Sequence, residues 1–274
     1  MKNKWTGERL ETFVYNENMI EHLHRYSIAI PYVKHKTVLD IASGEGYGSN
    51  LLSREAQFVF GVDIDAEAVA AAEAKYGSSK ISFLQGSADE IPVETGTIDV
   101  VVSFETLEHH DKHEEMLAEI KRVLKPGGLL IMSSPDKKYY TDVTGYVNKF
   151  HVRELYADEF RALISRYFKH GAFLNQRFLA GSLITAERRE LPMEVHSGKY
   201  EKLNSVVPFT PVYNLVIASD DRIREVADSI FTADEWYNIL AADIAARFTS
   251  SFTWRIGSMV VKPLNLIRKI VRSN

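Results

Sequence analysis

The stretch Thr37-Val38-Leu39-Asp40-Ile41-Ala42-Ser43-Gly44-Glu45-Gly46-Tyr47-Gly48-Ser49 decides the fold. Its first half is apolar and β-branched and ends near the acid Asp40, and three glycines follow at every second position. Residues 50–54 are typical of the start of a helix. Strand, tight glycine turn and helix in this order form a unit that holds a nucleotide-like ligand against bare backbone.

The spacing of the glycines indicates which nucleotide-like ligand the turn binds. Dinucleotides are bound by G-x-G-x-x-G, with the pyrophosphate on the helix N-terminus. Here the spacing is G-x-G-x-G, and Ser49 stands in the place of the third glycine. Asp40 would repel a pyrophosphate but attracts an ammonium group in a partly dry cleft. S-adenosylmethionine carries an ammonium beside its sulfonium, so we expect it as the cofactor. A glycine turn without a ligand and a nicotinamide dehydrogenase are the alternatives.

Composition narrows the function classes. The 274 residues suffice for one large α/β domain with additions, or for two small domains. The net charge of -4 argues against general nucleic-acid binding. The chain has no cysteine, which excludes disulfides, thiolate metal sites and cysteine nucleophiles. The N-terminus shows no signal-peptide pattern and no apolar run reaches about 20 residues, so we expect a cytoplasmic protein, with the inner face of the membrane as a further option.

Alternating strands and helices predict a parallel sheet with right-handed crossovers. We expect further strands at 58–63, 81–84, 98–103, 129–132, 171–179 and 211–218. We expect helices at 17–32, 66–75, 114–124, 158–167 and 221–248, with Asp158 as an N-cap. The first of these helices is predicted to be a lid over the cofactor, with Arg25 or a neighbour meeting the cofactor carboxylate. Residues 180–209 show no clear period and are expected to overhang the active site.

An acid at the end of the second strand completes the expected cofactor site. Asp63 follows the first glycine of the turn by about 20 residues, the spacing at which an acid accepts hydrogen bonds from a ribose diol. Ile64 would contact the adenine face. Residues 85–89 turn at the same sheet edge, where they can read the adenine amino group.

Five segments resemble class I S-adenosylmethionine-dependent methyltransferases, in sequence and in order. They are residues 38–46, 61–64, 86–92, 103–109 and 124–128. The resemblance covers about residues 37–135 and implies a Rossmann-like, seven-stranded, mostly parallel α/β sheet whose last strand is antiparallel. Shorter segments at 6–9, 21–26, 148–155 and from 252 onward are similar to methyltransferases encoded with O-antigen and other surface-glycan pathways.

The resemblance also implies cofactor-binding residues. Asp40, Gly44 and Gly46 would hold the methionine end, beside Ala42. Asp63 would hold the ribose and Ile64 would lie beside the adenine. The remaining residues expected to line the cofactor are Ser87, Ala88, Asp89, Ser103, Phe104 and Glu105. Many relatives carry an acid at the position of Ser87, so the adenine amino group would be met by this serine or by Asp89.

The expected reaction is in-line attack of a nucleophile on the sulfonium methyl group, with S-adenosylhomocysteine as the product. A sugar hydroxyl needs a general base near neutral pH, and histidine suits that role. The candidates are His109 and His151, with His110 behind them. Metal assistance through Glu108, His109, Asp111 and His113 is conceivable. Their spacing is no specific metal signature, so we predict no metal.

These observations predict three parts of the chain and one leading function. Residues 1–36 are an N-terminal arm and lid helix, 37–220 a methyltransferase domain, and 221–274 a helical extension. We expect an O-methyltransferase acting on a sugar of a bacterial surface glycan, with a saccharide or glycolipid as acceptor. The alternatives are methylation of a small metabolite or lipid head group, and a non-catalytic cofactor-binding scaffold.

The C-terminal residues suggest a contact surface. Residues 251–274 contain basic residues interleaved with apolar ones and a tryptophan, but no acid. A basic amphipathic stretch of this kind suits a membrane interface or a glycan-assembly partner. A helix docked on its own domain is the alternative.

Overall fold

The computed structural model describes residues 12, 15–179, 181–187, 194–195, 198–200, 202–203, 207–208 and 210–259. The chain divides into two compact units, Met1–Phe231 and Thr232–Asn274, which we describe separately. The predicted arm at 1–16 falls almost entirely outside the described residues, as do 14 of the 30 residues of the predicted insertion at 180–209.

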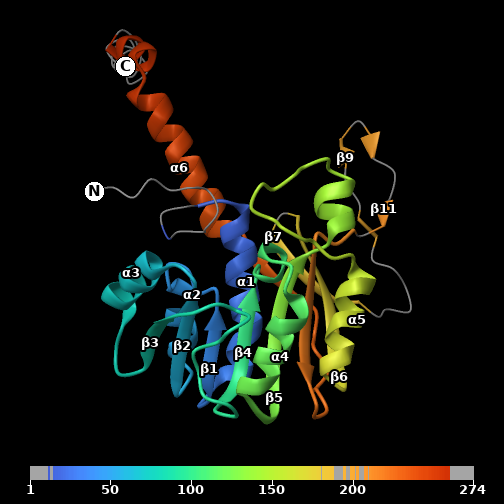
Figure 1. The fold of residues 1–274 in the computed structure, drawn as a ribbon. Coiled ribbons are helices and arrows are strands. Elements are labelled where there is room, and N and C mark those ends of the chain that lie inside the picture. Colours follow the sequence, from blue (N-terminus) through green and yellow to red (C-terminus); the bar gives the residue numbers. More distant parts are fainter. Residues whose placement is uncertain are drawn as a thin grey trace. The chain divides into compact units, whose positions relative to one another are not determined.

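The first unit is built on a nine-stranded mixed sheet with the order β13-β7-β6-β12-β5-β4-β1-β2-β3 (Figure 1). Its strands are β1 (Thr37–Ile41), β2 (Phe58–Asp63), β3 (Ile81–Gln85), β4 (Ile98–Phe104), β5 (Leu124–Pro135), β6 (His170–Phe178), β7 (Gly181–Ala186), β12 (Tyr213–Ser219) and β13 (Ser229–Thr232). Strands β3, β2, β1, β4 and β5 pair in parallel, whereas β12 is antiparallel to both β5 and β6. The expected mostly parallel core is therefore present, and β12 is a late antiparallel strand within it.

The prediction of seven strands was wrong because two segments were misassigned. Residues 181–186, expected to be an irregular insertion, form β7, which pairs with β6 in antiparallel register. The segment expected to be helical from 221 contains β13, and its helix begins only at Asp234. The short strands β8 (Glu194–Val195), β9 (Gly198–Lys199), β10 (Lys202–Leu203) and β11 (Val207–Pro208) form two separate small sheets.

Helices cover both faces of the sheet. They are α1 (Glu17–Val33), α2 (Tyr47–Ser53), α3 (Ala66–Tyr76), α4 (His113–Val123) and α5 (Ala157–Tyr167), with a 3-10 turn η1 (Leu107–His109) and a π-helical turn η2 (Lys138–Asp142). The Asn16 side chain caps α1 by accepting the Met19 N–H at 3.1 Å. The cap of α5 is Tyr156 rather than Asp158, because Glu159 reaches back to accept the Tyr156 N–H at 3.0 Å.

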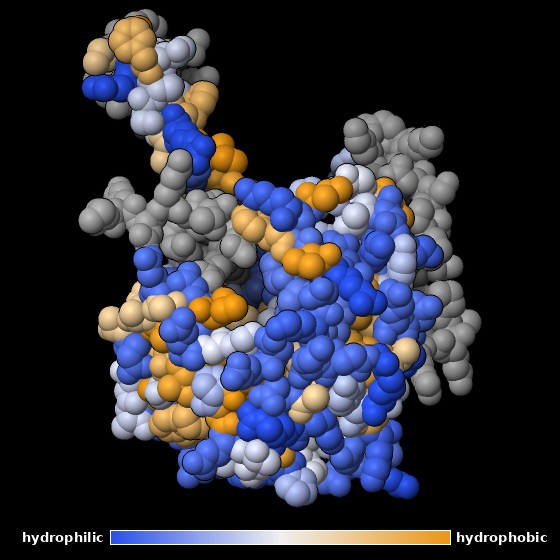
Figure 2. All heavy atoms as spheres, viewed as in Figure 1, coloured by the Kyte–Doolittle hydropathy of each residue, from blue (hydrophilic) through white to orange (hydrophobic). Residues whose placement is uncertain are grey.

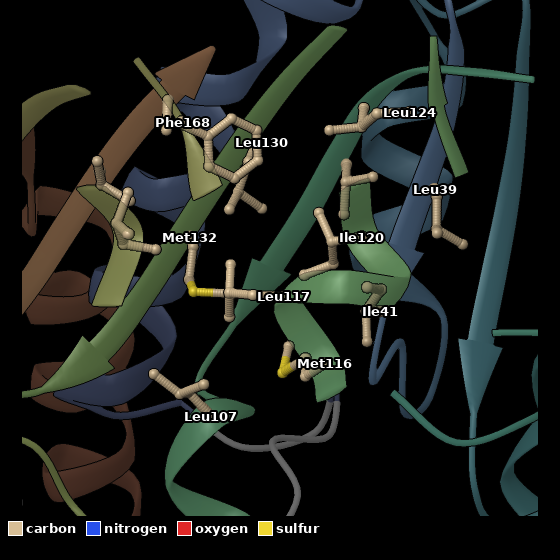
Figure 3. Close-up of a cluster of buried hydrophobic side chains, with 14 of the residues drawn as sticks. Leu39, Ile41, Leu107, Met116, Leu117, Ile120, Leu124, Leu130, Met132 and Phe168 are labelled. Carbon is tan, nitrogen blue, oxygen red and sulfur yellow. The ribbon is translucent and has the colours of Figure 1, made fainter. Parts of the chain in front are cut away.

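Alternation along β1 distributes its side chains between two apolar layers. Leu39 and Ile41 pack in the cluster that α4 and α5 cover. In Figure 3, Met116, Leu117 and Ile120 of α4 project among the strands that carry Leu39, Ile41, Leu130 and Met132. Val38 faces the opposite layer, with residues of α1, α2 and α3. Both faces of β1 are therefore buried, as expected for a parallel strand in the middle of a sheet.

The second unit contains α6 (Asp234–Ser250), followed by helical residues 252–259. Its exposed large apolar side chains are Tyr237, Ile239, Leu240, Ile244, Phe248, Phe252, Trp254, Ile256 and Met259. Polar and apolar side chains alternate along α6 in Figure 2. Among the helices that the structure describes, none combines the length and apolar character needed to cross a bilayer. Residues 260–274 of the predicted basic tail lie outside the described residues.

A close approach between α1 and α2 depends on one glycine. A Cβ at Gly48 would lie 2.0 Å from the Cζ and the hydroxyl oxygen of Tyr26, which is buried. The backbone at Gly48 is helical, so no conformational constraint requires glycine there. The requirement is steric: Tyr26 occupies the space that a side chain would need.

We expect Gly48→Ala to lower the free energy of unfolding by about 1–3 kcal/mol, because the added methyl overpacks a buried contact. Urea unfolding followed by circular dichroism measures the change. Gly257→Ala is the matched control, since Gly257 is a helical glycine and a Cβ added there would have no atom within 4 Å. Equal stability of Gly48→Ala and the parent would contradict the close approach.

Candidate active site

A cavity of about 530 Å³ lies at the carboxyl ends of β1, β2 and β4. This is the edge at which open α/β sheets bind ligands, and the volume suits a cofactor. The predicted residues on its wall are Ala42, Gly44, Asp63, Ile64, Ser87, Ala88, Asp89, Phe104, Glu105, His109 and His110. The cavity also includes Asn16, Asn18, His22, Tyr26 and Tyr47, which the sequence analysis did not assign to the site.

Two non-glycine residues with left-handed backbone lie on the cavity wall. Ala42, directly after β1, has a φ of 57°, and Glu105, directly after β4, has a φ of 52°. Such conformations cost about 1–3 kcal/mol and cluster at functional sites. Here each one turns the chain sharply at a strand end and places backbone on the cavity.

Asp63 stands at the end of β2 as predicted, and it also holds the glycine turn. Its Oδ2 accepts the Gly44 N–H at 2.8 Å and its Oδ1 accepts the Asp65 N–H at 3.0 Å. Ile64 beside it is 68% exposed. The carboxylate and the neighbouring apolar side chain therefore face the cavity together, where a ribose and an adenine face would need them.

Asp40 lies one layer behind the cavity wall. Its carboxyl is buried, accepts the Ser49 hydroxyl at 2.7 Å, and lies 3.4 Å from the hydroxyl of Tyr26. Burial raises the pKa of Asp40 to about 7, against the opposing effect of the two hydrogen bonds. Tyr26 lines the cavity and Asp40 does not, so the ring of Tyr26 lies between the Asp40 carboxyl and the cavity. Gly46 and Ser103 likewise lie outside the cavity lining.

The expected adenine end carries a charged cluster. The Ser87 hydroxyl donates to Asp89, whose Oδ2 also pairs with the Lys112 ammonium at 2.5 Å. The hydrogen bond from Lys112 is the largest of the effects that lower the pKa of Asp89 to about 2. Asp89 is therefore the carboxylate at this position, and the hydroxyl proton of Ser87 is directed to it.

The structure places Arg25 differently from the prediction. Its side chain is buried, and its Nε donates to the Gln176 Oε1 at 2.7 Å. Its Nη1 lies 3.4 Å from the Glu105 Oε1, and the guanidinium stacks 4.3 Å from the centre of the Tyr213 ring. Arg25 is not among the residues that line the cavity. The face of α1 that meets the cavity carries His22 and Tyr26, which are four residues apart and so lie on one side of a helix.

Two of the three predicted catalytic histidines lie side by side. The rings of His109 and His151 meet edge to face with 5.2 Å between their centroids. The Nδ1 of His109 lies 3.1 Å from the Phe150 carbonyl oxygen. His110 turns elsewhere, with its Nε2 3.3 Å from the Met116 sulfur. Tertiary structure thus pairs His109 with His151, 42 positions along the chain, rather than with its sequence neighbour.

The residues that can hold a metal ion differ from the conceivable set named from the sequence. Glu108, His109 and His151 each offer a ligand atom, and these atoms lie within 4.8 Å of one another. His113 instead places its Nε2 2.8 Å from the His110 carbonyl oxygen. His151 was not in the expected metal set because it is far away in sequence.

The chain is similar to several known methyltransferases. Residues 39–132 match the model of a methyltransferase domain. A probable S-adenosylmethionine-dependent methyltransferase of Mycobacterium tuberculosis is 34% identical over 162 residues, which are 58% of this chain and 58% of that protein. A fatty-acid O-methyltransferase of Mycolicibacterium smegmatis is 26% identical over 43% of this chain and 47% of its own length.

A solved structure supports the same fold. A methyltransferase of Archaeoglobus fulgidus described as S-adenosylmethionine-dependent aligns with a TM-score of 0.54 and 21% identity, over 74% of this chain and 93% of its own. The chain spans less than two thirds of the length of the curated relatives named above. Residues 39–132 of this chain match a methyltransferase domain, and the relative of Mycobacterium tuberculosis is named as S-adenosylmethionine-dependent.

We expect the affinity for S-adenosylmethionine to fall as the pH is lowered from 7 to 5.5. A cationic ligand favours the carboxylate form of Asp40, whose pKa is about 7, so the protein must lose a proton to bind it. Below that pKa, each pH unit weakens binding by up to about tenfold. Isothermal titration at several pH values measures the dissociation constant.

Asp40→Asn removes this titration while keeping the shape of the side chain. Its dissociation constant is expected to be weaker near pH 7 and nearly flat across the same range. A variant that keeps the steep dependence of the parent would show that another group, such as the buried Glu21, controls it.

Proposed function

We propose that this protein is an S-adenosylmethionine-dependent O-methyltransferase that acts on a sugar hydroxyl of a bacterial surface glycan, such as lipopolysaccharide or O-antigen. The observation that carries the O-methyl assignment is the His109–His151 pair beside the cofactor cavity. Oxygen acceptors need help to lose their proton near neutral pH, and a pair of imidazoles supplies it. The proposal of a glycan acceptor is supported by residues 21–26 and 148–155, which are similar to methyltransferases encoded with surface-glycan pathways.

The chemistry requires little covalent help from the protein. The sulfonium already activates the methyl carbon, so the site mainly holds acceptor oxygen, carbon and sulfur in line. The oxygen attacks the methyl carbon, the carbon–sulfur bond breaks, and S-adenosylhomocysteine leaves. The histidine pair acts on the acceptor hydroxyl, either by taking its proton or by another form of activation.

A lipid acceptor is the second candidate, because two relatives are named as methyltransferases of lipids. One relative is named a fatty-acid O-methyltransferase, and another, of Mycobacterium ulcerans, is named a phthiotriol/phenolphthiotriol dimycocerosates methyltransferase and is 28% identical over 116 residues. The apolar side chains exposed along α6 and up to Met259 suit contact with a membrane face or a glycan-assembly protein. We therefore propose an acceptor, whether glycolipid or lipid, at the cytoplasmic surface of the membrane.

Transfer of labelled methyl from S-adenosylmethionine into fractions of the host cell tests the acceptor class. We expect label in the glycolipid and polysaccharide fraction, at a position that is stable to ester hydrolysis. Label in simple lipids, removed by mild base, would instead favour a carboxyl acceptor. Cofactor binding without label in any fraction would favour the cofactor-binding scaffold.

Separate His109→Ala and His151→Ala variants test the histidine pair. We expect kcat to fall by about 10²–10⁴-fold in each, because activation of the acceptor is lost. The affinity for S-adenosylmethionine should change by less than about threefold if the pair serves the acceptor. His170→Ala is the control, because His170 is exposed at the opposite end of the sheet, where β6 begins. Near-normal turnover in both variants would refute the assignment.

A further inference from the structure

Hydrogen bonds to backbone carbonyl groups join the two segments that carry His109 and His151. The Glu108 carbonyl oxygen accepts the N–H groups of Val152 and Arg153 at 2.8 and 3.1 Å. The Phe150 carbonyl oxygen is bound by His109 in return. Turn η1 and the segment before α5 therefore form one assembly, which fixes the positions of Glu108, His109 and His151 before any ligand arrives.

The hydrogen bonds of His109 define which of its nitrogens can bind a cation. A carbonyl oxygen only accepts hydrogen bonds, so the Nδ1 that faces the Phe150 carbonyl at 3.1 Å carries the proton. In the neutral ring, Nε2 then carries the lone pair. This Nε2 lies 4.0 Å from the Glu108 Oε1.

His151 is held in the same tautomer by different partners. Its Nδ1 lies 2.6 Å from the Glu154 Oε1 and donates to it. Its Nε2 lies 2.9 Å from the amide nitrogen of Asn148, which donates to the ring. Asn148 is oriented by its own Oδ1, which accepts the Phe150 N–H at 3.1 Å. In both rings Nδ1–H is held against an oxygen, so Nε2 is the nitrogen that carries no proton.

The carboxyl group of Glu108 is buried, and one of its oxygens makes no hydrogen bond to the described residues. The residue is 1% exposed, and its Oε1 has no hydrogen-bond partner among the described residues. Its Oε2 has one long contact, 3.4 Å from the Ser134 hydroxyl. A buried carboxylate oxygen without a partner is strongly unfavourable, because it has lost its hydration and gained nothing in return. One carboxylate oxygen and two imidazole nitrogens lie within 4.8 Å of one another. A cation bound between them would stabilise all three groups.

We propose that Glu108, His109 and His151 bind one divalent transition-metal ion. Two imidazoles and one carboxylate suit manganese, iron, cobalt or zinc, and they leave further coordination positions for water or substrate. The Phe150 carbonyl and Glu154 act as the outer hydrogen-bond partners that orient metal-binding imidazoles. The ion takes the place of the Asn148 amide at His151. Because His109 lines the cofactor cavity, the open positions face the reacting groups.

The chemical role of the ion rests on the proposed function. An acceptor hydroxyl coordinates the ion, which lowers its pKa, and its proton passes to solvent water. The resulting alkoxide donates an electron pair to the methyl carbon. The carbon–sulfur bond breaks and its electron pair stays on sulfur, giving neutral S-adenosylhomocysteine. The histidines then serve as ligands, and no protein base is needed for the proton.

Titration of the full-length, tag-free protein with Co²⁺ tests the site directly, without any assay of activity. We expect one Co²⁺ per chain, seen as visible absorption bands, and competition by Mn²⁺ or Zn²⁺. Glu108→Gln, His109→Ala and His151→Ala should each weaken Co²⁺ binding by at least about tenfold. His170→Ala, which removes an exposed imidazole, should bind Co²⁺ as the parent does. Titration with S-adenosylmethionine in the same samples checks that each variant is folded.

The two proposals fail in different ways. Absence of Co²⁺ binding in the parent, or binding that survives all three substitutions, would overturn the metal site, because a proton would then satisfy Glu108. Methyl transfer that continues in excess chelator would overturn the role of the ion. Tight Co²⁺ binding that the three substitutions abolish, in a protein that methylates no oxygen acceptor, would support the site and refute the proposed function.

Discussion

A single buried carboxyl joins three elements of the first unit. Asp40 sits at the end of β1, accepts the hydroxyl of Ser49 on α2, and meets the hydroxyl of Tyr26 on α1. The glycine turn runs between Asp40 and Ser49, so this contact sets the shape of the turn. It also brings α1 over the sheet, where Tyr26 becomes part of the cavity wall. Gly48 makes the arrangement sterically possible.

A second buried network connects α1 with the other half of the sheet. Arg25 contacts Gln176 on β6, Tyr213 on β12 and Glu105 after β4. Glu105 is further held by the Ser133 hydroxyl at 2.6 Å. Burial raises the pKa of nearby Glu21 to about 7, so the charge of this network depends on pH near neutrality. Removing one partner of such a network is costly, because it leaves the opposite charge buried without compensation. The network therefore keeps α1 and the strained backbone at Glu105 in place.

Local pattern predicted the core of the fold and many of the residues that the structure brings together at one cavity. Glycine spacing, the acid after β2 and the alternation of apolar strands with amphipathic helices are properties of neighbouring residues, so Asp63, Ile64 and residues 86–89 lie on the cavity as expected. The predictions of secondary structure were wrong in segments where pairing with a neighbouring strand outweighs the local sequence pattern. Residues 181–186 carry little periodic signal, yet they become a strand because β6 offers an open edge. Ser229–Thr232 joins the sheet in a segment whose composition favours helix.

By itself, the sequence determined the β1–turn–α2 unit, the nature of its cofactor and the identity of the candidate histidines. Only tertiary structure decided that Arg25 is a buried structural charge, that Asp40 lies behind Tyr26, and that His109 meets His151 while His110 packs against a sulfur. The physical reason is distance along the chain. The spacing of a helix or strand relates residues within a few positions, whereas the Glu108–His109–His151 cluster is formed by backbone hydrogen bonds between segments some 40 residues apart.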